Sequence, residues 1–367
     1  MAPMAGPPIP PTPCTRGCAC AGRAGTGAGG CGIKGDALVV ERAASVLSAD
    51  MSRDFVGYGP SPPDPQWPNG ARIAVNFVIN FEEGSEPNFE EDGATEAGLI
   101  ECPSDAAPGT RDLASESMFE YGSRVGFWRV LREFEKRDLP ATVMACALAL
   151  QRLPQATEAI LGRPDLFDLC CHGYRWENHF DMEPAHERQQ IRKALALMEQ
   201  LTGSKTTGWY CRTAPSENTR AILLEEGGDS ILYDSDAYND EIPYWTTVPV
   251  HGTERPHLVV PYSLCTNDSK YAPGRAFSTS DDYFTFLRDA FDVLYEEGGK
   301  MMSCGLHMRL IGHPARIKGL RQFMDYIAGF PDVWVCKREE IANHWLKVHP
   351  YRTSSASAPP AAPVAKL

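Results

Sequence analysis

Residues 72–84 read Arg-Ile-Ala-Val-Asn-Phe-Val-Ile-Asn-Phe-Glu-Glu-Gly, and this stretch decides the fold. Its apolar run, rich in Ile, Val and Phe, predicts a buried strand. The strand ends in two adjacent carboxylates, Glu82 and Glu83, followed by Gly84. Because buried acids are costly unless they are paired, the two glutamates indicate either a polar turn or a functional site at the strand end. This stretch alone leaves both interpretations open.

Apolar runs alternate with helical patterns along the rest of the chain. We expect further strands at residues 141–147, 167–171, 207–210, 231–233, 257–262, 301–306 and 333–335. We expect helices at residues 119–137, 184–202, 281–297, 316–330 and 338–347, and another that ends at residue 226. Such alternation indicates parallel βα units, and about eight strands in about 300 residues suit one α/β barrel better than two domains. Residues 84–115 are expected to form a long polar loop, which is usually functional or mobile.

The two ends of the chain differ in composition from its middle. Residues 1–50 are rich in Gly, Pro and Cys and show no sustained period, so we expect a disordered extension there. A transit peptide and a start at Met51 are two open interpretations of it. We expect one catalytic barrel domain over residues 51–350 and a disordered tail over residues 351–367. The tail ends in Ala365-Lys366-Leu367, a variant of the Ser-Lys-Leu address, which predicts a peroxisomal import receptor as partner, with the cytoplasm as the alternative location.

Charge and missing motifs exclude several classes of function. The formal net charge is −13, with 48 acidic against 35 basic side chains, which argues against nucleic acid or an anionic membrane as a main partner. The sequence contains no GxSxG elbow, GxGxxG fingerprint or P-loop, so a serine hydrolase and a nucleotide cofactor are unsupported. Cys170, Cys171 and Cys211 are conceivable nucleophiles, but a role as small buried apolar residues explains them more simply.

Polar side chains follow directly on the predicted strands. They are Glu82 and Glu83, His172 and Arg175, Arg212, Asp234 and Asp236, and His307 and Arg309. In a (β/α) barrel these strand ends converge on one mouth, where catalytic groups from different strands meet. Carboxylates and imidazoles serve as general bases and acids, and arginines stabilise oxyanions. The recurrence of such groups favours a catalytic site over a series of polar turns.

These segments resemble the polysaccharide deacetylase (NodB-homology) superfamily, and within it the metal-independent allantoinase branch of urate catabolism. The resemblance runs from about residue 54 to residue 350. Among the segments that carry it are Asn80-Phe-Glu-Glu-Gly84, Cys171-His-Gly-Tyr-Arg-Trp176, Leu232-Tyr-Asp-Ser-Asp236, Thr266-Asn-Asp268 and Gly305-Leu-His-Met-Arg-Leu-Ile-Gly312. It implies a distorted TIM-like barrel, hydrolysis of C–N bonds and assembly as a homo-oligomer, a tetramer.

The sequence departs from the metal-dependent members of this superfamily at two points. Those members place an Asp-Asp pair after the first strand and a second histidine four residues beyond the first. Here the acidic pair is Glu82-Glu83, and Trp176 stands four residues beyond His172. A catalytic zinc needs three convergent protein ligands, so the missing imidazole disfavours a metal cofactor, although His179 lies nearby in sequence. The expected cofactor is therefore none.

The resemblance implies an allantoinase, which opens the cyclic amide of allantoin to allantoate. Glu82 or Glu83 would be the base, Arg212 with His172 would stabilise the oxyanion, and His307 would protonate the leaving nitrogen. Arg212 stands one residue nearer its strand than the family's arginine does. The expected substrate-binding residues are Arg175, Trp176, Trp209, Asp234, Tyr262 and Arg309. The alternatives are a polysaccharide N-deacetylase or another cyclic-imide hydrolase on the same barrel and, third, a binding protein that has lost activity.

Overall fold

The computed structural model describes residues 53–102, 104–107, 109–212 and 214–352. The chain divides into two units, and the fold belongs to the second, which begins at Tyr58. The extension predicted at residues 1–50 and the Ala-Lys-Leu ending both lie outside the described residues.

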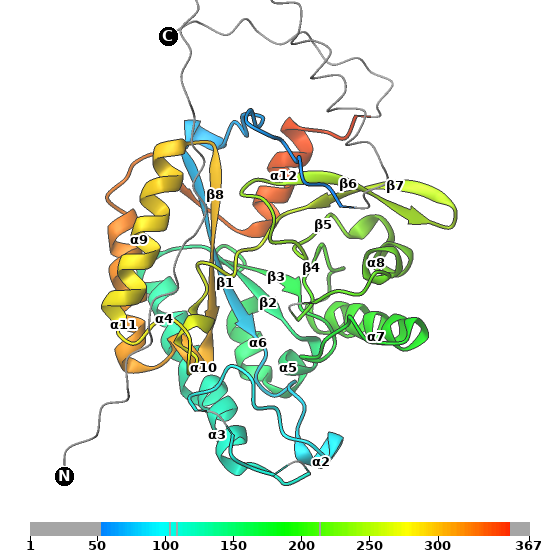
Figure 1. Ribbon diagram of the computed structural model, residues 1–367, viewed down its shortest axis with the longest axis vertical. Helices are drawn as coiled ribbons and strands as arrows, with labels where there is room; N and C mark the ends of the chain where they lie inside the picture. The colour runs from blue at the N-terminus through cyan, green and yellow to red at the C-terminus, as the bar shows by residue number, and fades with distance from the viewer. Residues whose placement is uncertain (1–52, 103, 108, 213, 353–367) are drawn as a thin grey trace, which may run out of the picture. The chain divides into compact units, whose positions relative to one another are not determined.

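The described residues build one sheet of nine strands with helices packed around it (Figure 1). The order across the sheet is β6-β7-β5-β4-β3-β2-β1-β8, and β9 pairs with β1. Paired strands are parallel except β6 and β7, which form an antiparallel hairpin. The strands are β1 (Ile73–Phe81), β2 (Ala141–Ala145), β3 (Phe167–Cys171), β4 (Gly208–Trp209), β5 (Tyr233–Asp234), β6 (Tyr244–Val250), β7 (Thr253–Val259), β8 (Lys300–His307) and β9 (Val333–Val335).

Strand β1 lies in the middle of this sheet, which explains its continuous apolar run. All nine of its residues are buried. It pairs with β8 from Ile73 to Asn80, while its other edge meets β9 near its start and β2 near its end. A strand covered on both faces and paired on both edges has no exposed side on which polar residues could alternate. Glu82 and Glu83 therefore follow a fully buried strand, and both are themselves buried.

The sheet curls into a distorted barrel that is not closed by a continuous ladder. Between β7 and β8 the contact is made by the chain that follows β7. There Asn267 forms an isolated parallel bridge with Gly305, and the Thr266 hydroxyl donates a hydrogen bond of 2.5 Å to the Ser303 carbonyl. A side chain on Gly305 would collide with Asn267 and the Tyr262 hydroxyl, so the seam requires glycine at this position.

The helices lie outside the sheet, and most of the predicted ones are present. They are α2 (Phe89–Asp92), α3 (Leu113–Tyr121), α4 (Phe127–Arg137), α5 (Ala147–Arg152), α6 (Pro154–Leu161), α7 (Pro184–Thr202), α8 (Thr219–Gly227), α9 (Ser280–Glu297), α10 (Met308–Ile311), α11 (Pro314–Ile327) and α12 (Arg338–Val348), with short helical turns η1 (Pro68–Gly70), η2 (Gly122–Gly126), η3 (Gly228–Ser230) and η4 (Asp268–Tyr271). Within the described residues, none of these helices is long and apolar enough to cross a bilayer.

Helices α2, α6 and α10 were not predicted, and three further segments also differ from the sequence-based expectation. The helix predicted at residues 119–137 is interrupted by η2, a π-helical turn whose Gly126 packs directly on the backbone of Met308. The strand predicted at residues 141–147 ends at Ala145, and Ala147 begins α5, because a run of Ala and Leu suits a buried helix as well as a strand. Strand β6 was not predicted, since only two of its seven residues are buried.

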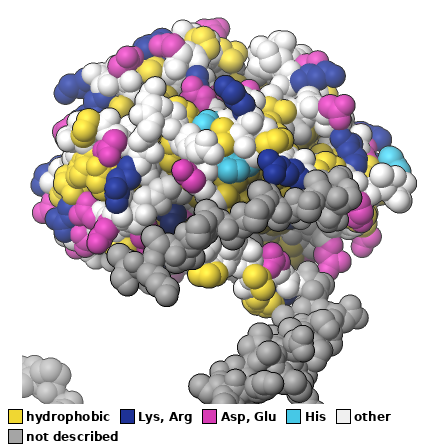
Figure 2. All heavy atoms as spheres, turned by 90° about the horizontal axis from the view of Figure 1, so that it is seen from above, with side chains coloured by type: hydrophobic (Ala, Val, Ile, Leu, Met, Phe, Trp, Pro, Cys, Tyr) yellow, Lys and Arg dark blue, Asp and Glu magenta, His cyan; other side chains and the backbone are white. Residues whose placement is uncertain are grey.

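Charged side chains of both signs share the surface on the side where β1 and β8 begin. Figure 2, viewed from that side, shows acidic and basic side chains intermixed with apolar ones. On this face, therefore, the net charge of −13 is not gathered into a single acidic patch.

Candidate active site

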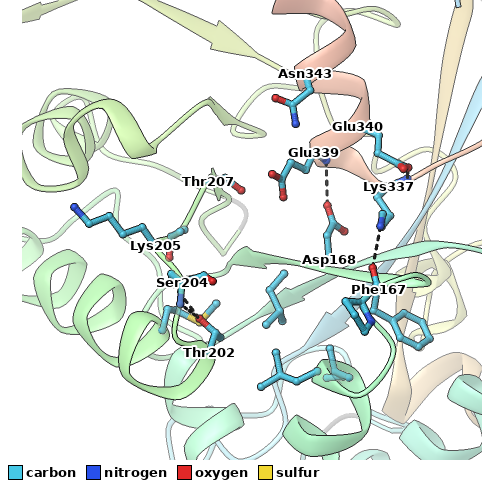
Figure 3. A pocket seen from close by; sticks show the side chains of 16 residues that line it. Phe167, Asp168, Thr202, Ser204, Lys205, Thr207, Lys337, Glu339, Glu340 and Asn343 are labelled. Carbon is cyan, nitrogen blue, oxygen red and sulfur yellow. Dashed lines mark hydrogen bonds between the residues drawn. The ribbon is translucent and has the colours of Figure 1, made fainter. Parts of the chain in front are cut away.

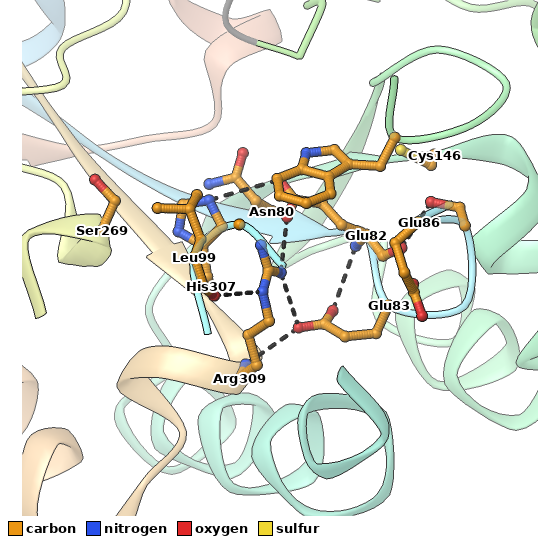
Figure 4. A network of polar contacts seen from close by, with 12 residues as sticks. Asn80, Glu82, Glu83, Glu86, Leu99, Cys146, Ser269, His307 and Arg309 are labelled. Carbon is orange, nitrogen blue, oxygen red and sulfur yellow. Dashed lines mark hydrogen bonds and ion pairs between the residues drawn. The ribbon is translucent and has the colours of Figure 1, made fainter. Parts of the chain in front are cut away.

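Glu82 is the centre of a buried polar network at the carboxyl end of β1 (Figure 4). Its Oε1 lies 3.2 Å from His172 Nε2 and 3.5 Å from His307 Nε2. Its Oε2 lies 2.7 Å from Arg309 Nη1. The partners come from the ends of β3 and β8 and from the start of α10, so the strand ends converge as the barrel predicts. All four side chains are buried.

His172 is oriented by the backbone of the neighbouring strand end. Its Nδ1 lies 2.9 Å from the carbonyl oxygen of Tyr210, which can only accept a hydrogen bond, so Nδ1 carries a hydrogen. The other ring nitrogen, Nε2, then faces Glu82 Oε1 at 3.2 Å, so the two side chains are in direct polar contact.

His307 is held by Asp268, the first residue of η4. The imidazole Nδ1 lies 2.6 Å from Asp268 Oδ1, and Asp268 Oδ2 accepts from the backbone nitrogens of His307 and Ile311 at 2.7 and 3.1 Å. Burial lowers the pKa of His307, but the charges of Glu82 and Asp268 outweigh burial and raise that pKa to about 9. At neutral pH His307 is therefore an imidazolium whose Nε2–H faces Glu82.

Arg309 is the cation that the two glutamates share. Its Nη1 lies 2.7 Å from Glu82 and 3.2 Å from Glu83, and its Nε donates to the Leu99 carbonyl at 2.9 Å. The guanidinium carbon lies 4.6 Å from the ring centre of Phe119 and 4.7 Å from that of Trp176. Its Nη2 is buried and has no hydrogen-bond partner among the described residues. Arg309 thus presents one unused donor beside Glu82.

The two adjacent glutamates have opposite electrostatic environments. Burial raises the pKa of Glu82, but Arg309, His307 and His172 outweigh it, so the net pKa lies well below the ordinary value. For Glu83, burial dominates over Arg309 and the pKa is raised. Glu83 Oε1 also accepts from the Arg309 backbone at 3.1 Å, and a side chain on Gly122 would collide with this carboxylate. Glu83 is packed against η2, whereas Glu82 faces the imidazoles.

The available donors do not fit a catalytic metal. Glu83 is bound by Arg309, and Trp176 supplies no ligand at the position four residues beyond His172. His179 pairs with Glu187 at 3.1 Å and is not in contact with Glu82. Across the residues described, no group of three or more His, Cys, Asp or Glu side chains is arranged to hold a metal ion. Where a metal-dependent site would place its cation beside the paired acids, this chain places a guanidinium.

Residues 84–101, which we call the strap, contact the ends of several strands. Besides Arg111, which pairs with Glu90, five arginines from other parts of the fold bind it, through acids or backbone carbonyls. The pairs are Arg152 with the Gly84 carbonyl (2.6 Å), Arg175 with Asp92 (2.7 Å), Arg212 with Glu96 (2.6 Å), Arg309 with the Leu99 carbonyl (2.9 Å) and Arg316 with Glu101 (2.6 Å). The polar loop predicted at residues 84–115 is therefore fixed in its first half, across the mouth of the barrel.

Of the other predicted site residues, Arg212 and Trp176 adjoin the network and Arg175 serves the strap. The Arg212 guanidinium carbon lies 3.7 Å from the ring centre of Trp176, and its Nη1 donates to the Trp176 carbonyl and to Glu96. Arg212 has no contact with Glu82, so its predicted role as oxyanion donor lacks support in the geometry. The Arg175 guanidinium donates to the Asp92 carboxylate and to the Glu86 carbonyl.

Three predicted substrate-binding residues are committed to structural contacts. Trp209 is fully buried and donates to Cys211 Sγ at 3.2 Å. Asp234 is fully buried between Arg220 and His257, at 2.7 and 2.8 Å. The Tyr262 hydroxyl is bonded by the amides of Asn80 and Asn267, at 3.3 and 3.1 Å, and so ties β1 to the seam of the barrel. A position directly after a strand therefore does not show whether a side chain lines the active site or makes a buried structural contact.

Asp268 and Tyr210 belong to the network but were not among the predicted site residues. Asp268 lies in a segment that carries the family resemblance, after the strand predicted at residues 257–262, and this was the signal that could have identified it. Tyr210 acts through its backbone carbonyl and through its ring, which stacks on His172 with 4.9 Å between centres. Because any residue has a backbone carbonyl, the contact between Tyr210 and His172 could not be predicted from the residue type at position 210.

The chain is similar over most of its length to proteins that carry the name polysaccharide deacetylase, with the qualifiers given below. The family model described as "Polysaccharide deacetylase" matches residues 110–226. A Schizosaccharomyces pombe protein named "Putative polysaccharide deacetylase" is 40% identical over 322 residues, which are 82% of this chain and 99% of that protein.

Two solved structures match equally well. A protein described as a "probable Polysaccharide deacetylase" from Pseudomonas aeruginosa PAO1 has 44% identity and a TM-score of 0.77, covering 82% of this chain and 100% of its own. PuuE allantoinase has 45% identity and a TM-score of 0.77, covering 83% of this chain and 100% of its own. The chain belongs to the polysaccharide deacetylase family and is a hydrolase of that family.

Proposed function

We propose that this hydrolase opens the cyclic amide of allantoin to give allantoate, without a metal ion. The similarity to PuuE allantoinase, at 45% identity over that protein's whole chain, supports this choice within the family. The observation that carries the proposal is the cation at the acidic pair: Arg309 takes the place beside Glu82 and Glu83 that a metal would need.

The strap supports a small substrate rather than a polymer. It is fixed by arginines that follow β3, β4 and β8, so it spans the mouth instead of lining one side of an open groove. A closed pocket with several polar partners suits a compact molecule rich in amide donors and acceptors. A polysaccharide chain would need both ends of the site open.

Glu82 is the base in this proposal. It takes a proton from a water molecule, and the resulting hydroxide attacks the ring carbonyl carbon. Because the pKa of Glu82 is depressed, the carboxylate is always ionised but is a weak base. The reaction then depends on charge stabilisation elsewhere. Arg309 Nη2, a buried donor without a partner among the described residues, would receive the developing oxyanion.

His307 is the acid. Its imidazolium gives the Nε2 proton to the ring nitrogen as the C–N bond breaks, and the tetrahedral intermediate collapses to the open product. Glu82 is then protonated and His307 is neutral. Since Glu82 Oε1 and His307 Nε2 lie 3.5 Å apart, a proton passing between them restores the starting state. The proposal assigns oxyanion stabilisation to Arg309 in place of Arg212.

Polysaccharide N-deacetylation is the second candidate. It is favoured by the name of the Schizosaccharomyces pombe relative, which is 40% identical. The two candidates differ in the bond cleaved, since a deacetylase releases acetate from an acyclic amide. They also differ in the access that the substrate needs at the strap.

A substrate panel separates the candidates. Purified full-length protein is incubated with allantoin, with hydantoin as a related cyclic imide, and with N-acetylglucosamine oligomers, each with a chelator and with added zinc. We expect allantoate from allantoin under both conditions and no acetate from the oligomers. Acetate release without allantoate would replace the proposal with the deacetylase, and no product from any substrate would reject both.

A further inference from the structure

A cavity of about 630 Å³ lies beside Asp168 and the first residues of α12 (Figure 3). It is bounded by the start of β3, the segment before β4 and the first turn of α12. Asp168 is the second residue of β3, whereas His172 follows the last one. Four residues of extended strand span about 13 Å, so the cavity is separate from the candidate active site.

The cavity contains polar atoms that the protein leaves without partners. Thr206 is 7% exposed, and its hydroxyl makes no hydrogen bond among the described residues. Asp168 Oδ2 accepts from the backbone nitrogen of Glu339 at 3.1 Å and thereby caps α12, but its Oδ1 is buried without a partner. Buried polar groups are nearly always hydrogen-bonded, so both atoms call for a ligand or for water.

Acids outnumber lysines among the residues that line the cavity: they are Asp168, Glu339 and Glu340 against Lys205 and Lys337. The carboxylate of Glu339 points into the space between Asp168 and Thr207 in Figure 3, and no ion pair or hydrogen bond engages it in the described part of the chain. Lys337 Nζ donates to the carbonyls of Pro164 and Asp165 at 3.0 and 3.4 Å; its charge lowers the pKa of Asp168, but burial outweighs it and raises that pKa to about 6. Lys205 is exposed, and its side chain extends away from Asp168.

Part of the remaining wall of the cavity is apolar, and Thr202, Ser204, Thr207 and Asn343 line the rest. The apolar part is formed by Phe167, Leu169, Met198 and Ile160. An inorganic cation would leave this wall without a partner, and Asp168 and Glu339 together supply fewer carboxylates than a divalent ion usually requires. A ligand that fits both the acidic and the apolar part of the cavity carries a positive, donor-rich group on a short hydrocarbon body.

We propose that this cavity is a second binding site, specific for a small organic cation with an ammonium or guanidinium head and a short apolar tail. The head would donate to Asp168 Oδ1, to the Glu339 carboxylate and to the Thr206 hydroxyl. The tail would cover Leu169 and Met198. This site is independent of the proposed catalytic function, because none of its residues contacts Glu82 or its partners.

Calorimetric titration of the full-length protein with n-butylguanidinium chloride tests the proposal. We expect saturable binding of one ligand per chain with a dissociation constant on the order of 1 mM, typical of a fragment-sized ligand. Butyrate, n-butanol and potassium chloride at equal concentration should show no saturable binding. Glu339→Gln and Thr206→Val should each weaken binding at least fivefold. Glu254→Gln, which changes an exposed acid elsewhere, is the matched control and should bind as the unmodified protein does.

The variants also show whether the ligand binds in this cavity or in the candidate active site. Binding that survives Glu82→Gln but weakens in Glu339→Gln assigns it to the cavity. Binding lost in Glu82→Gln and unchanged in Glu339→Gln would place the cation in the candidate active site and overturn the proposal. Absence of saturable binding, or equal affinity in all variants, would overturn it as well.

Discussion

His307 Nε2 lies 3.5 Å from Glu82 Oε1, and Asp268 holds the other nitrogen of the same ring at 2.6 Å. The imidazole therefore stands between two carboxylates, one of which only fixes it while the other faces the mouth. This arrangement keeps the ring charged at neutral pH and gives the site an acid beside its base.

The first prediction concerns the alkaline limb of the pH profile. The pKa of His307 is raised to about 9, above the ordinary histidine value near 6.5, so the ring keeps its proton up to about pH 9 and loses it above. For allantoin hydrolysis we expect kcat/KM to fall above about pH 9. Asp268→Asn removes one of the two charges that raise this pKa, so the limb should move to lower pH. An unchanged limb in this variant would show that His307 is not the acid.

The second prediction separates the two glutamates. Glu82→Gln should lower kcat by about 10³-fold, within the range expected for loss of a general base. Glu83→Gln resembles the protonated form that burial already favours at that position, so we expect a loss of tenfold or less. Both substitutions replace a carboxylate by an amide of the same shape at adjacent positions, so each variant is the control for the other. Equal losses in both would contradict the assignment of the base to Glu82.

The third prediction concerns the strap. Arg212 and Glu96 are largely buried and lie 2.6 Å apart, so Glu96→Gln should weaken this attachment by about 1.5–3 kcal/mol, as for other hydrogen bonds to charged groups. A looser strap should raise KM more than it lowers kcat, and hydrogen exchange of residues 84–101 should speed up. Glu90→Gln is the control on the same strap, because the Glu90 side chain is 71% exposed. Equal kinetics in both variants would mean that the strap does not confine the substrate.

The fourth prediction concerns the glycine beneath Glu83. A methyl group at Gly122 would collide with the Glu83 carboxylate, since η2 packs directly on that side chain. We expect Gly122→Ala to destabilise the protein by about 1–3 kcal/mol, the usual cost of overpacking. Thermal unfolding measures this loss, with Ser123→Ala, at a half-buried position in the same turn, as the control. An unchanged midpoint would show that Glu83 can move away without cost.

Part of this site was predictable from sequence because residue type and strand position carry the signal. The run from Ile73 to Phe81 predicted a buried central strand, and the acids after it predicted a site. His172, His307 and Arg309 also follow or end strands and do meet Glu82. Parallel strands bring their carboxyl ends together, so position along the chain translates into proximity.

Residues whose contacts do not support their predicted roles show what strand position cannot convey. Asp234 follows the same rule as His307, but Arg220 and His257 bury it as an internal ion pair. Arg212 and Arg309 carry the same chemical group, and only the fold decides which guanidinium reaches the glutamates. The choice depends on contacts far apart in sequence, such as Leu99 with Arg309, which no local pattern encodes.

The central claim is that Arg309 replaces a metal at a carboxylate base. The most direct test is allantoin hydrolysis by full-length protein that has been treated with a chelator and analysed for bound metal. The account predicts full allantoate release at a metal content well below one ion per chain, with no gain on adding zinc, and loss of activity in Arg309→Met. Activity that vanishes with the metal and returns with zinc would contradict it.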